Sequence, residues 1–496
     1  MVQGVVITFQ TSQLFNMPKD NQFTIRLKNF SAGYAPLAFS DSLVESGGEG
    51  HASVMQNVSV SDGKLTQGPG LSNLTNGTQS GNVTELINFI LDRATSDNVG
   101  WAIGVTKLFK LSSTAVTSGT AISGCTDGES LVALKGNLYG FYNKSSGGDI
   151  FKMPLTSESI TASWGSTTPS GAAALQNAIH PSAAKEDIIV FGNGQYAGVY
   201  IVENNTLDVD KLDFGSGTVV SDVVFNNGYW WLAVNSGVTG TNRTDSQIYL
   251  YDGAAIVSTL SDETFVGVQR IGFLYVIEGV VYVAYQDLTA SGFIIGYISG
   301  KAVKPLVRFS GTLPTFAQKT LYKNTILFLS SALVFSAGAF VPELPYALSQ
   351  IADGGYATVG AIAAPFGTPM VSSTDGGSNH RLALFSGYET ASLWKSIVFP
   401  VSAGKVKGFL DDITVLTNTL GSGASCSMTI EYDQAASTSS AKTITTTGKR
   451  RHYFNNFGMN GVEDFRVAFD WSAGSTSNPV TIREVVINGH YIETAF

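Results

Sequence analysis

The chain has 496 residues and a formal charge of −9, with 29 Lys and Arg against 38 Asp and Glu. Only 14% of the residues are charged, against about 25% in ordinary soluble domains, and strand-favouring residues and 54 glycines stand in place of the missing Lys and Glu. This composition excludes a helical bundle, a coiled coil and a disordered chain, and the acidic balance argues against a general nucleic-acid binder.

Residues 1–85 contain few apolar runs and are rich in Gly and Ser, which predicts an extended N-terminal arm and assembly segment. A segment with so little core of its own is expected to become ordered by packing on a neighbouring subunit. The N-terminus lacks the features of a secretory signal, and no apolar run reaches about 18 residues, which predicts no membrane anchor. The helix that we predict is short and covers Thr84–Arg93.

Residues 86–398 carry a repeat of strand–turn–strand units. Apolar strands begin at residues 99, 137, 187, 229, 280, 325 and 368, and a second strand follows each after a polar or Gly-rich turn. Such a period is typical of the four-stranded blade of a β-propeller. One blade cannot bury both faces of its sheet, so neighbouring blades must cover it in a closed ring. The spacing predicts a seven-bladed β-propeller, with six or eight blades left open.

Residues 399–496 change to longer strands in which polar and apolar residues alternate. The clearest are Ser425–Tyr432, Asp464–Trp471 and Val480–Ile487. Alternation indicates sheets with one face on a core and one face in water. We therefore predict a C-terminal β-sandwich or jelly-roll domain, and an all-β chain as a whole.

The sequence carries no motif for catalysis, cofactor binding or metal binding. Cys125 and Cys426 fit neither a disulfide framework nor zinc spacing, and we expect two partly buried thiols. Gly-Lys pairs at Gly300 and Gly448 fall between strands and form no phosphate-binding loop. Five histidines show no ligand spacing, and we expect them at the surface or in capping positions: His51, His180, His380, His452 and His490. We predict no catalytic residues, no cofactor and no metal.

Four further features could carry chemistry, but each has a structural explanation that we favour. The turn Thr374–Asn379 could bind calcium, although Asp-Gly sequences usually form hairpin turns. The pairs Asp411-Asp412 and Glu463-Asp464 should point to opposite faces of their strands, which argues against cooperation. Lys449-Arg450-Arg451 could touch an acidic subunit or passing nucleic acid, or be a solvated loop. Trp230-Trp231 could stack on sugars, or belong to the blade core.

A family resemblance lies in the arm. Gln56-Asn57-Val58, Asp62-Gly63 and Pro69-Gly70 follow a looser match over Lys28–Leu37. These residues resemble the opening of bacteriophage virion proteins built on a β-propeller, among them the tail nozzle (tail tubular protein B-like) proteins of short-tailed phages. Gly68 stands where that family usually has Arg before Pro-Gly.

The resemblance implies a virion structural protein, not an enzyme, that sits in the phage tail and is assembled in the host cytoplasm. It implies a homo-oligomeric ring around the DNA exit channel, with a tail adaptor and tail fibres or spikes as partners, acting in genome ejection. A chain poor in Lys and Arg would let DNA pass without binding it, because binding by counterion release needs those cations. The alternatives are a tail-tip or surface propeller protein that binds a glycan or receptor and, last, a propeller hydrolase or lyase.

Overall fold

The computed structural model of the chain falls into two compact units. Unit 1 comprises Met1–Leu71, Val334–Gly354 and Phe385–Phe496, and unit 2 comprises Ser72–Leu333 and Gly355–Leu384. The residues that the structure describes are 22–28, 30, 33–34, 51–61, 63–79, 83–86, 99–236, 246–260, 268–287, 292–300, 302–309, 311–322, 325–331, 333–338, 347–352, 358–374, 379–401, 406–433, 437–459 and 461–493. Among them the regular elements are β-strands, apart from the short turns α2 (Trp164–Thr167) and η3 (Phe316–Gln318).

Strands β6 to β32 form seven sheets of three or four strands in the described part of the chain. The strand orders are β10-β9-β8-β7, β11-β12-β13, β14-β15-β16-β17, β18-β19-β20-β21, β22-β23-β24-β25, β26-β27-β28-β29 and β30-β31-β32-β6. The strands are β6 (Pro69–Gln79), β7 (Val83–Leu86), β8 (Gly100–Gly104), β9 (Lys107–Leu111), β10 (Val116–Ala121), β11 (Asp127–Leu134), β12 (Asn137–Asn143), β13 (Gly148–Pro154), β14 (Ser182–Lys185), β15 (Ile188–Asn193), β16 (Tyr196–Ile201), β17 (Thr206–Asp213), β18 (Thr218–Asn226), β19 (Tyr229–Ser236), β20 (Gln247–Tyr251), β21 (Ile256–Leu260), β22 (Val268–Ile277), β23 (Val280–Asp287), β24 (Phe293–Ser299), β25 (Ala302–Phe309), β26 (Lys319–Tyr322), β27 (Thr325–Ser330), β28 (Leu333–Gly338), β29 (Ala347–Ala352), β30 (Thr358–Ala363), β31 (Met370–Thr374) and β32 (His380–Tyr388).

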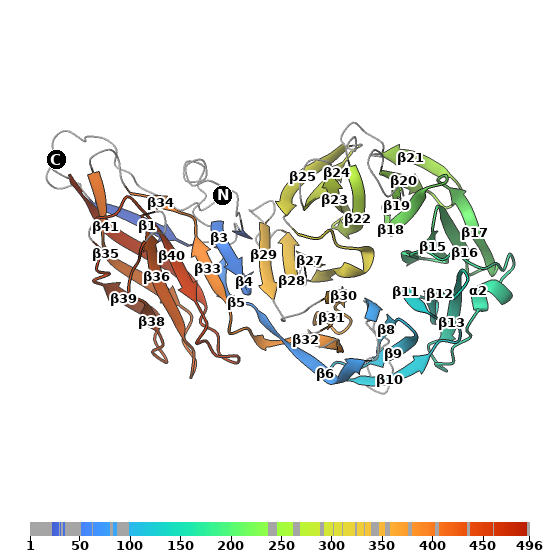
Figure 1. The fold of residues 1–496 in the computed structure, drawn as a ribbon, viewed down its shortest axis with the longest axis horizontal. Coiled ribbons are helices and arrows are strands. Elements are labelled where there is room, and N and C mark those ends of the chain that lie inside the picture. Colours follow the sequence, from blue (N-terminus) through green and yellow to red (C-terminus); the bar gives the residue numbers. More distant parts are fainter. Residues whose placement is uncertain are drawn as a thin grey trace. The chain divides into compact units, whose positions relative to one another are not determined.

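Consecutive sheets of unit 2 meet at their first strands. β11 contacts β7 and β14, β18 contacts β14 and β22, and β30 contacts β7. Figure 1 shows the sheets of unit 2 following one another around a ring from β8–β10 through β22–β25 to β30–β32. The last of them takes β6, a strand that precedes the first sheet in the sequence, as its fourth strand. A strand exchanged in this way covers the edge where the ring closes.

The second strands β12, β15, β27 and β31 are buried along nearly all of their length, which accounts for the continuous apolar runs in the sequence. Every residue of β8 and of β27 is buried, whereas in β10 only Val116 is buried. A strand that is covered on both faces needs apolar side chains at consecutive positions, and an outer strand does not.

A β-bulge recurs in the first strands of the sheets. The register shifts between Gly128 and Ser130 in β11 and between Val220 and Asp222 in β18. The residue after each bulge is a buried polar group that bonds toward the next sheet. Ser130 Oγ donates to His180 O at 2.5 Å, and Asp222 Oδ2 accepts from Leu274 N at 2.6 Å. The repeated device indicates units of similar construction.

Unit 1 contains two larger sheets. Sheet A has the order β39-β35-β41-β5-β4 with β1 on β41, and sheet B has the order β2-β3-β33-β40-β36-β37 with β34 on β40 and β38 on β36. The strands are β1 (Gln22–Leu27), β2 (Gly33–Tyr34), β3 (His51–Gln56), β4 (Val58–Ser61), β5 (Lys64–Gln67), β33 (Leu393–Ser396), β34 (Phe399–Pro400), β35 (Val406–Thr417), β36 (Cys426–Tyr432), β37 (Ser437–Thr438), β38 (Lys442–Ile444), β39 (Arg451–Asn455), β40 (Asp464–Asp470) and β41 (Ile482–Glu493).

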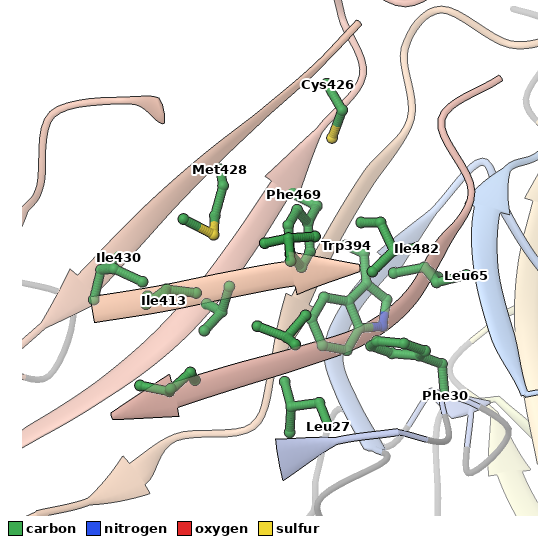
Figure 2. Close-up of a cluster of buried hydrophobic side chains, with 14 of the residues drawn as sticks. Leu27, Phe30, Leu65, Trp394, Ile413, Cys426, Met428, Ile430, Phe469 and Ile482 are labelled. Atoms are coloured by element: carbon green, nitrogen blue, oxygen red, sulfur yellow. The ribbon is translucent and has the colours of Figure 1, made fainter. Parts of the chain in front are cut away.

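One hydrophobic core joins the two sheets of unit 1. Figure 2 shows the ring of Trp394 close to Phe30, which meets it edge-on with ring centroids 5.2 Å apart. The core takes side chains from both ends of the chain, including Leu27, Phe30, Leu65, Ile413, Met428, Ile430, Phe469 and Ile482. The N-terminal strands therefore belong to the same folded body as the C-terminal strands.

The structure confirms the expected all-β fold of propeller type. The seven strand starts expected near residues 99 to 368 correspond to β8, β12, β15, β19, β23, β27 and β31, the second strands of the seven sheets. The strands expected after 399 correspond to β35, β36, β40 and β41.

Two expectations differ from the structure. The helix over Thr84–Arg93 is wrong at its start, where Val83–Leu86 is strand β7; residues 87–93 lie outside the described residues. The division into 1–85, 86–398 and 399–496 also differs, because the contacts divide the first segment at Leu71. The described strands before that point, β1 to β5, pair with strands of the same chain in sheets A and B, and packing of the arm on a neighbouring subunit stays a prediction.

Candidate functional site

The residues of the family resemblance lie where the chain passes from one sheet to another. Strand β3 ends at Gln56 in sheet B, and β4 begins at Val58 in sheet A. Asn57 between them has a φ of 53°, a left-handed conformation that Asn adopts more readily than most residues. The chain therefore changes sheet across a single residue.

Asn57 is buried and bonds to two segments that flank it in space. Its Nδ2 donates to Ala391 O at 3.0 Å, and its backbone O accepts from Ser392 Oγ at 2.6 Å and from Gly68 N at 2.5 Å. Leaving one such buried group unpaired costs about 1–3 kcal/mol. Asn57 thus has a structural role.

The second motif contains the turn between β4 and β5. Asp62 lies outside the described residues, and Gly63 has a φ of 70°, which favours glycine. Gly63 O accepts from Phe30 N at 3.1 Å, and Phe30 is 1% exposed against Trp394. The turn therefore fixes the looser first motif onto the core of unit 1.

The third motif begins strand β6. A Cβ on Gly70 would lie 2.7 Å from Ser386 O, so only glycine fits there without a shift of the backbone. Gly68, at the position where the resembling phage proteins usually have Arg, accepts from Glu389 N at 2.9 Å through its backbone O. The described residues Asn57, Gly63 and Gly70 thus act through backbone geometry and packing.

The carboxyl of Glu129 is the clearest chemical feature of unit 2. It lies at the bulge of β11 and accepts a hydrogen bond from Asn143 Nδ2 at 2.7 Å. Burial, reinforced by the charge of Asp127, raises the pKa of Glu129 to about 8. The group is largely protonated at neutral pH and could donate a proton. No motif signals it, because a lone Glu in Asp-Gly-Glu-Ser has no distinguishing pattern.

Other buried carboxylates in unit 2 are occupied by donors. Asp149 is fully buried and accepts from Ser166 Oγ at 2.6 Å and from Lys144 Nζ at 2.7 Å. Ile150 N also donates to it, at 2.8 Å. Asp222 is bonded by Leu274 N and by Lys319 Nζ. These arrangements tie segments together.

The expectation that Asp411 and Asp412 point to opposite faces is wrong. The register of β35 against β41 shifts between Leu410 and Asp412, so Asp411 is the extra residue of a bulge. Asp411 Oδ1 lies 2.7 Å from His490 Nδ1, and Asp412 Oδ1 accepts from Asn488 Nδ2 at 2.9 Å. His490 and Asn488 are two apart on β41 and share a face, so both carboxylates lie on that face. Asp464 is the first residue of β40, and Glu463 precedes the strand.

The histidines are spread over both units, and two of them contradict the expected surface positions. His180 is fully buried, with Nδ1 2.8 Å from Gly192 O, and burial lowers its pKa to about 4. His452 is 4% exposed, with Nε2 3.3 Å from Thr417 Oγ1, and burial lowers its pKa. His380 is partly exposed on β32, and His51 begins β3.

The other sequence candidates are also placed by the fold. Trp230 is 2% exposed and lies in one core cluster, and Trp231 is half-buried against another and donates from Nε1 to Asn226 O at 3.3 Å, so both belong to the core of the sheets. Lys449, Arg450 and Arg451 are exposed. Residues 375–378 of the possible calcium turn lie outside the described residues.

The two cysteines are free and buried, in agreement with the expectation. Burial raises the pKa of Cys125 to about 12 and that of Cys426 well above its usual value. Within the described ranges, no three His, Cys, Asp or Glu side chains gather as they would around a metal ion. In the same ranges, no helix has the length and apolarity to cross a membrane.

No family model and no curated protein matches the chain. Solved structures similar to it include the exo-β-1,3-galactanase from Phanerochaete chrysosporium with β-1,3-galactotriose (10% identity, 64% of this chain and 97% of that chain, TM-score 0.31). The N-terminal domain of Nup159 is 8% identical and covers 64% of this chain and 96% of its own, with a TM-score of 0.40. The WD40 β-propeller domain of Doa1 is 13% identical and covers 63% and 96%, with a TM-score of 0.41. These similarities assign no function.

Proposed function

We propose that this chain is a structural protein of a bacteriophage particle, a tail nozzle or another head-to-tail component that surrounds the DNA exit channel. The observation that carries the proposal is the role of the resembling residues. Asn57 turns the chain between sheets A and B, and Gly70 permits the close approach at the start of β6. Residues that set backbone geometry are what the members of a family of scaffold proteins are expected to have in common.

The proposal includes the finer architecture. Strands β6 to β32 make a seven-bladed propeller in which β6 completes the last blade, supported by the seven sheets among the described strands. The two sheets of unit 1 are a β-sandwich, supported by their common hydrophobic core. This sandwich takes strands β1 to β5 as well as the C-terminal strands, so the described part of the arm before Leu71 belongs to it.

The proposed role is not enzymatic. Asp149 and Asp222 accept several hydrogen bonds each from backbone and lysine donors, which supports a bracing function for the buried carboxylates. The excess of 38 acidic over 29 basic residues supports passage of DNA without tight binding, since counterion-release binding requires cations.

Copies of the chain would form a ring in the particle, with a tail adaptor and tail fibres or spikes as its partners. Outer strands supply surface for such contacts. In β21, Ile256 is 38% exposed and Val257 is 49% exposed. Association with a neighbouring subunit that covers such a strand is favourable, because it removes the apolar side chains from water.

Mass spectrometry of gradient-purified particles tests the proposal. We expect the chain to sediment with intact particles in several copies per particle, and to stay with them after the DNA is ejected. A soluble protein of the same lysate, followed in parallel, controls for carry-over. Recovery of the chain only in the soluble fraction would refute the virion role. Sedimentation of the purified chain, with and without virion proteins, would give the number of copies in the assembled ring.

A further inference from the structure

The side chains of strand β39 (Arg451–Asn455) point alternately to the two faces of sheet A. His452 and Phe454 turn inward, where His452 is 4% exposed and Phe454 packs against the core of unit 1. Arg451 and Tyr453 are both exposed. Residues two apart on a strand share a face and lie roughly 7 Å apart. One face of sheet A therefore presents a guanidinium group beside an aromatic ring.

Tyr453 is 58% exposed, more than any other large hydrophobic side chain among the described residues. It lies opposite Thr414 of β35 and has no aromatic partner within the described ranges. A tyrosine offers an apolar ring face and a polar hydroxyl, a combination that packs on ligands with one apolar and one polar side. The C–H face of a pyranose ring is such a surface.

A row of hydrogen-bonding side chains crosses the sheet next to Tyr453. Thr24 Oγ1 donates to Asn488 Oδ1 at 3.0 Å, and Asn488 Nδ2 donates to Asp412 Oδ1 at 2.9 Å. Asn455 lies opposite Asp412 on β39, two residues from Tyr453. These bonds hold the row in place before any ligand arrives, which lowers the entropic cost of binding. Amide, carboxylate and hydroxyl groups match the donors and acceptors of sugar hydroxyls.

The charge of Arg451 indicates that a ligand of this face carries an acidic group. It lies opposite Leu416 and has no ion-pair partner among the described residues. Lys449 and Arg450 precede it and are exposed, in a chain whose net charge is −9. A guanidinium group pairs with carboxylate or phosphate through two parallel hydrogen bonds. The charge complementarity therefore favours an anionic ligand at this end of the face.

We propose that this face, formed by Arg451, Tyr453, Asn455, Asp412, Asn488 and Thr24, binds an oligosaccharide that carries an acidic group. Single-stranded DNA would also stack on Tyr453, but Asp412 lies one row away and would repel its phosphates. A sugar with one anionic group can place that group at Arg451 and its hydroxyls along the polar row. The inference does not rest on the proposed virion role.

The test presents the full chain to an array of uronic-acid, sialylated and phosphorylated oligosaccharides, their neutral parents, and a ten-nucleotide oligothymidylate. We expect retention of acidic oligosaccharides. Tyr453→Ala should weaken it by about tenfold, while Tyr453→Phe keeps it. Arg451→Gln should remove the preference over the neutral parent. The three acidic classes distinguish a carboxylate from a phosphate.

Tyr229→Ala is the matched control, because Tyr229 is an exposed tyrosine of unit 2, 38% exposed. It should bind as the unchanged chain does, and all variants should melt at the same temperature. No retained acidic oligosaccharide, retention that Tyr453→Ala leaves unchanged, or stronger retention of the oligothymidylate would each overturn the proposal. Absence of the chain from phage particles would contradict the proposed virion role but not the proposed oligosaccharide site.

Discussion

A buried ion pair connects three successive sheets of unit 2 and gives the sharpest test of their packing. Asp222 of β18 accepts from Leu274 N of β22 at 2.6 Å and bonds to Lys319 Nζ of β26. Lys319 Nζ also donates to Leu274 O at 2.6 Å. The Asp222 side chain is 4% exposed and that of Lys319 is 12% exposed. Lys319→Met keeps the length of the apolar stem and removes the charge.

We expect Lys319→Met to lower the free energy of unfolding of unit 2 by about 3–5 kcal/mol, because it leaves a buried carboxylate without its cation. Burial raises the pKa of Asp222, and Lys319 opposes that rise. Removing the lysine therefore raises the pKa of Asp222 further. A carboxyl with a raised folded pKa stabilises the fold below its unfolded pKa and loses that contribution as the pH rises. The difference in the free energy of unfolding between the unchanged chain and the variant should therefore be smaller at pH 5 and larger at pH 8.

Hydrogen exchange of peptides covering β22, measured with urea unfolding at pH 5 and pH 8, reports on this unit separately from unit 1. The matched control is Lys135→Met, which breaks the exposed ion pair of Lys135 with Asp187. It should unfold like the unchanged chain at both pH values. The reasoning fails if the two variants behave alike, or if the deficit of Lys319→Met is the same at both pH values.

Three further predictions concern polar groups that the fold buries wholly or in part. Asn235→Ala should cost about 1–3 kcal/mol of stability in urea unfolding, because Asn235 bonds both N (2.7 Å) and O (2.9 Å) of Ile271, while the exposed Asn204→Ala should cost little. Glu129→Gln should match the unchanged chain at pH 5 and exceed its stability by roughly 1–3 kcal/mol at pH 8, since a pKa raised to about 8 destabilises the fold as the pH rises. Both cysteine thiols should resist iodoacetamide at pH 7.5 until urea unfolds the chain, because burial raises their pKa; modification of the folded chain would contradict this.

The sequence predicts the second and third strands of the sheets well, because second strands such as β12 and β31 are buried on both faces and the third strands keep short runs of apolar residues. Val190 and Phe191 of β15 are fully buried, and such consecutive apolar residues stand out from their surroundings. The first strands are harder to predict, since the bulges at Gly128 and Val220 break the alternation that marks a strand. β6 has the sequence PGLSNLTNGTQ, whose Gly and Asn residues give little strand signal; its partner β32 determines its conformation.

The face of sheet A shows why local rules fail at a site. Alternation assigns Asp411 and Asp412 to opposite faces, and one extra residue against β41 brings both to the same face. No pattern in the sequence marks that residue. The pairing of Thr24 with Asn488 joins positions 464 apart in sequence, so it depends on the tertiary fold alone.

Glu129 is the residue at which the scaffold and enzyme interpretations separate. Asp149 and Asp222 have their oxygens occupied by several donors, and a carboxylate so bonded cannot also accept a proton from a substrate. Glu129 has one bond from Asn143 and a pKa raised to about 8, which would suit a general acid. If it is one, Glu129→Gln abolishes an activity. Either role predicts the gain of stability at pH 8, because the substitution removes an ionisation that destabilises the fold. The result that separates the two roles is therefore whether particles carrying Glu129→Gln assemble and infect like unchanged particles, as a scaffold predicts, or lose a function, as a general acid predicts.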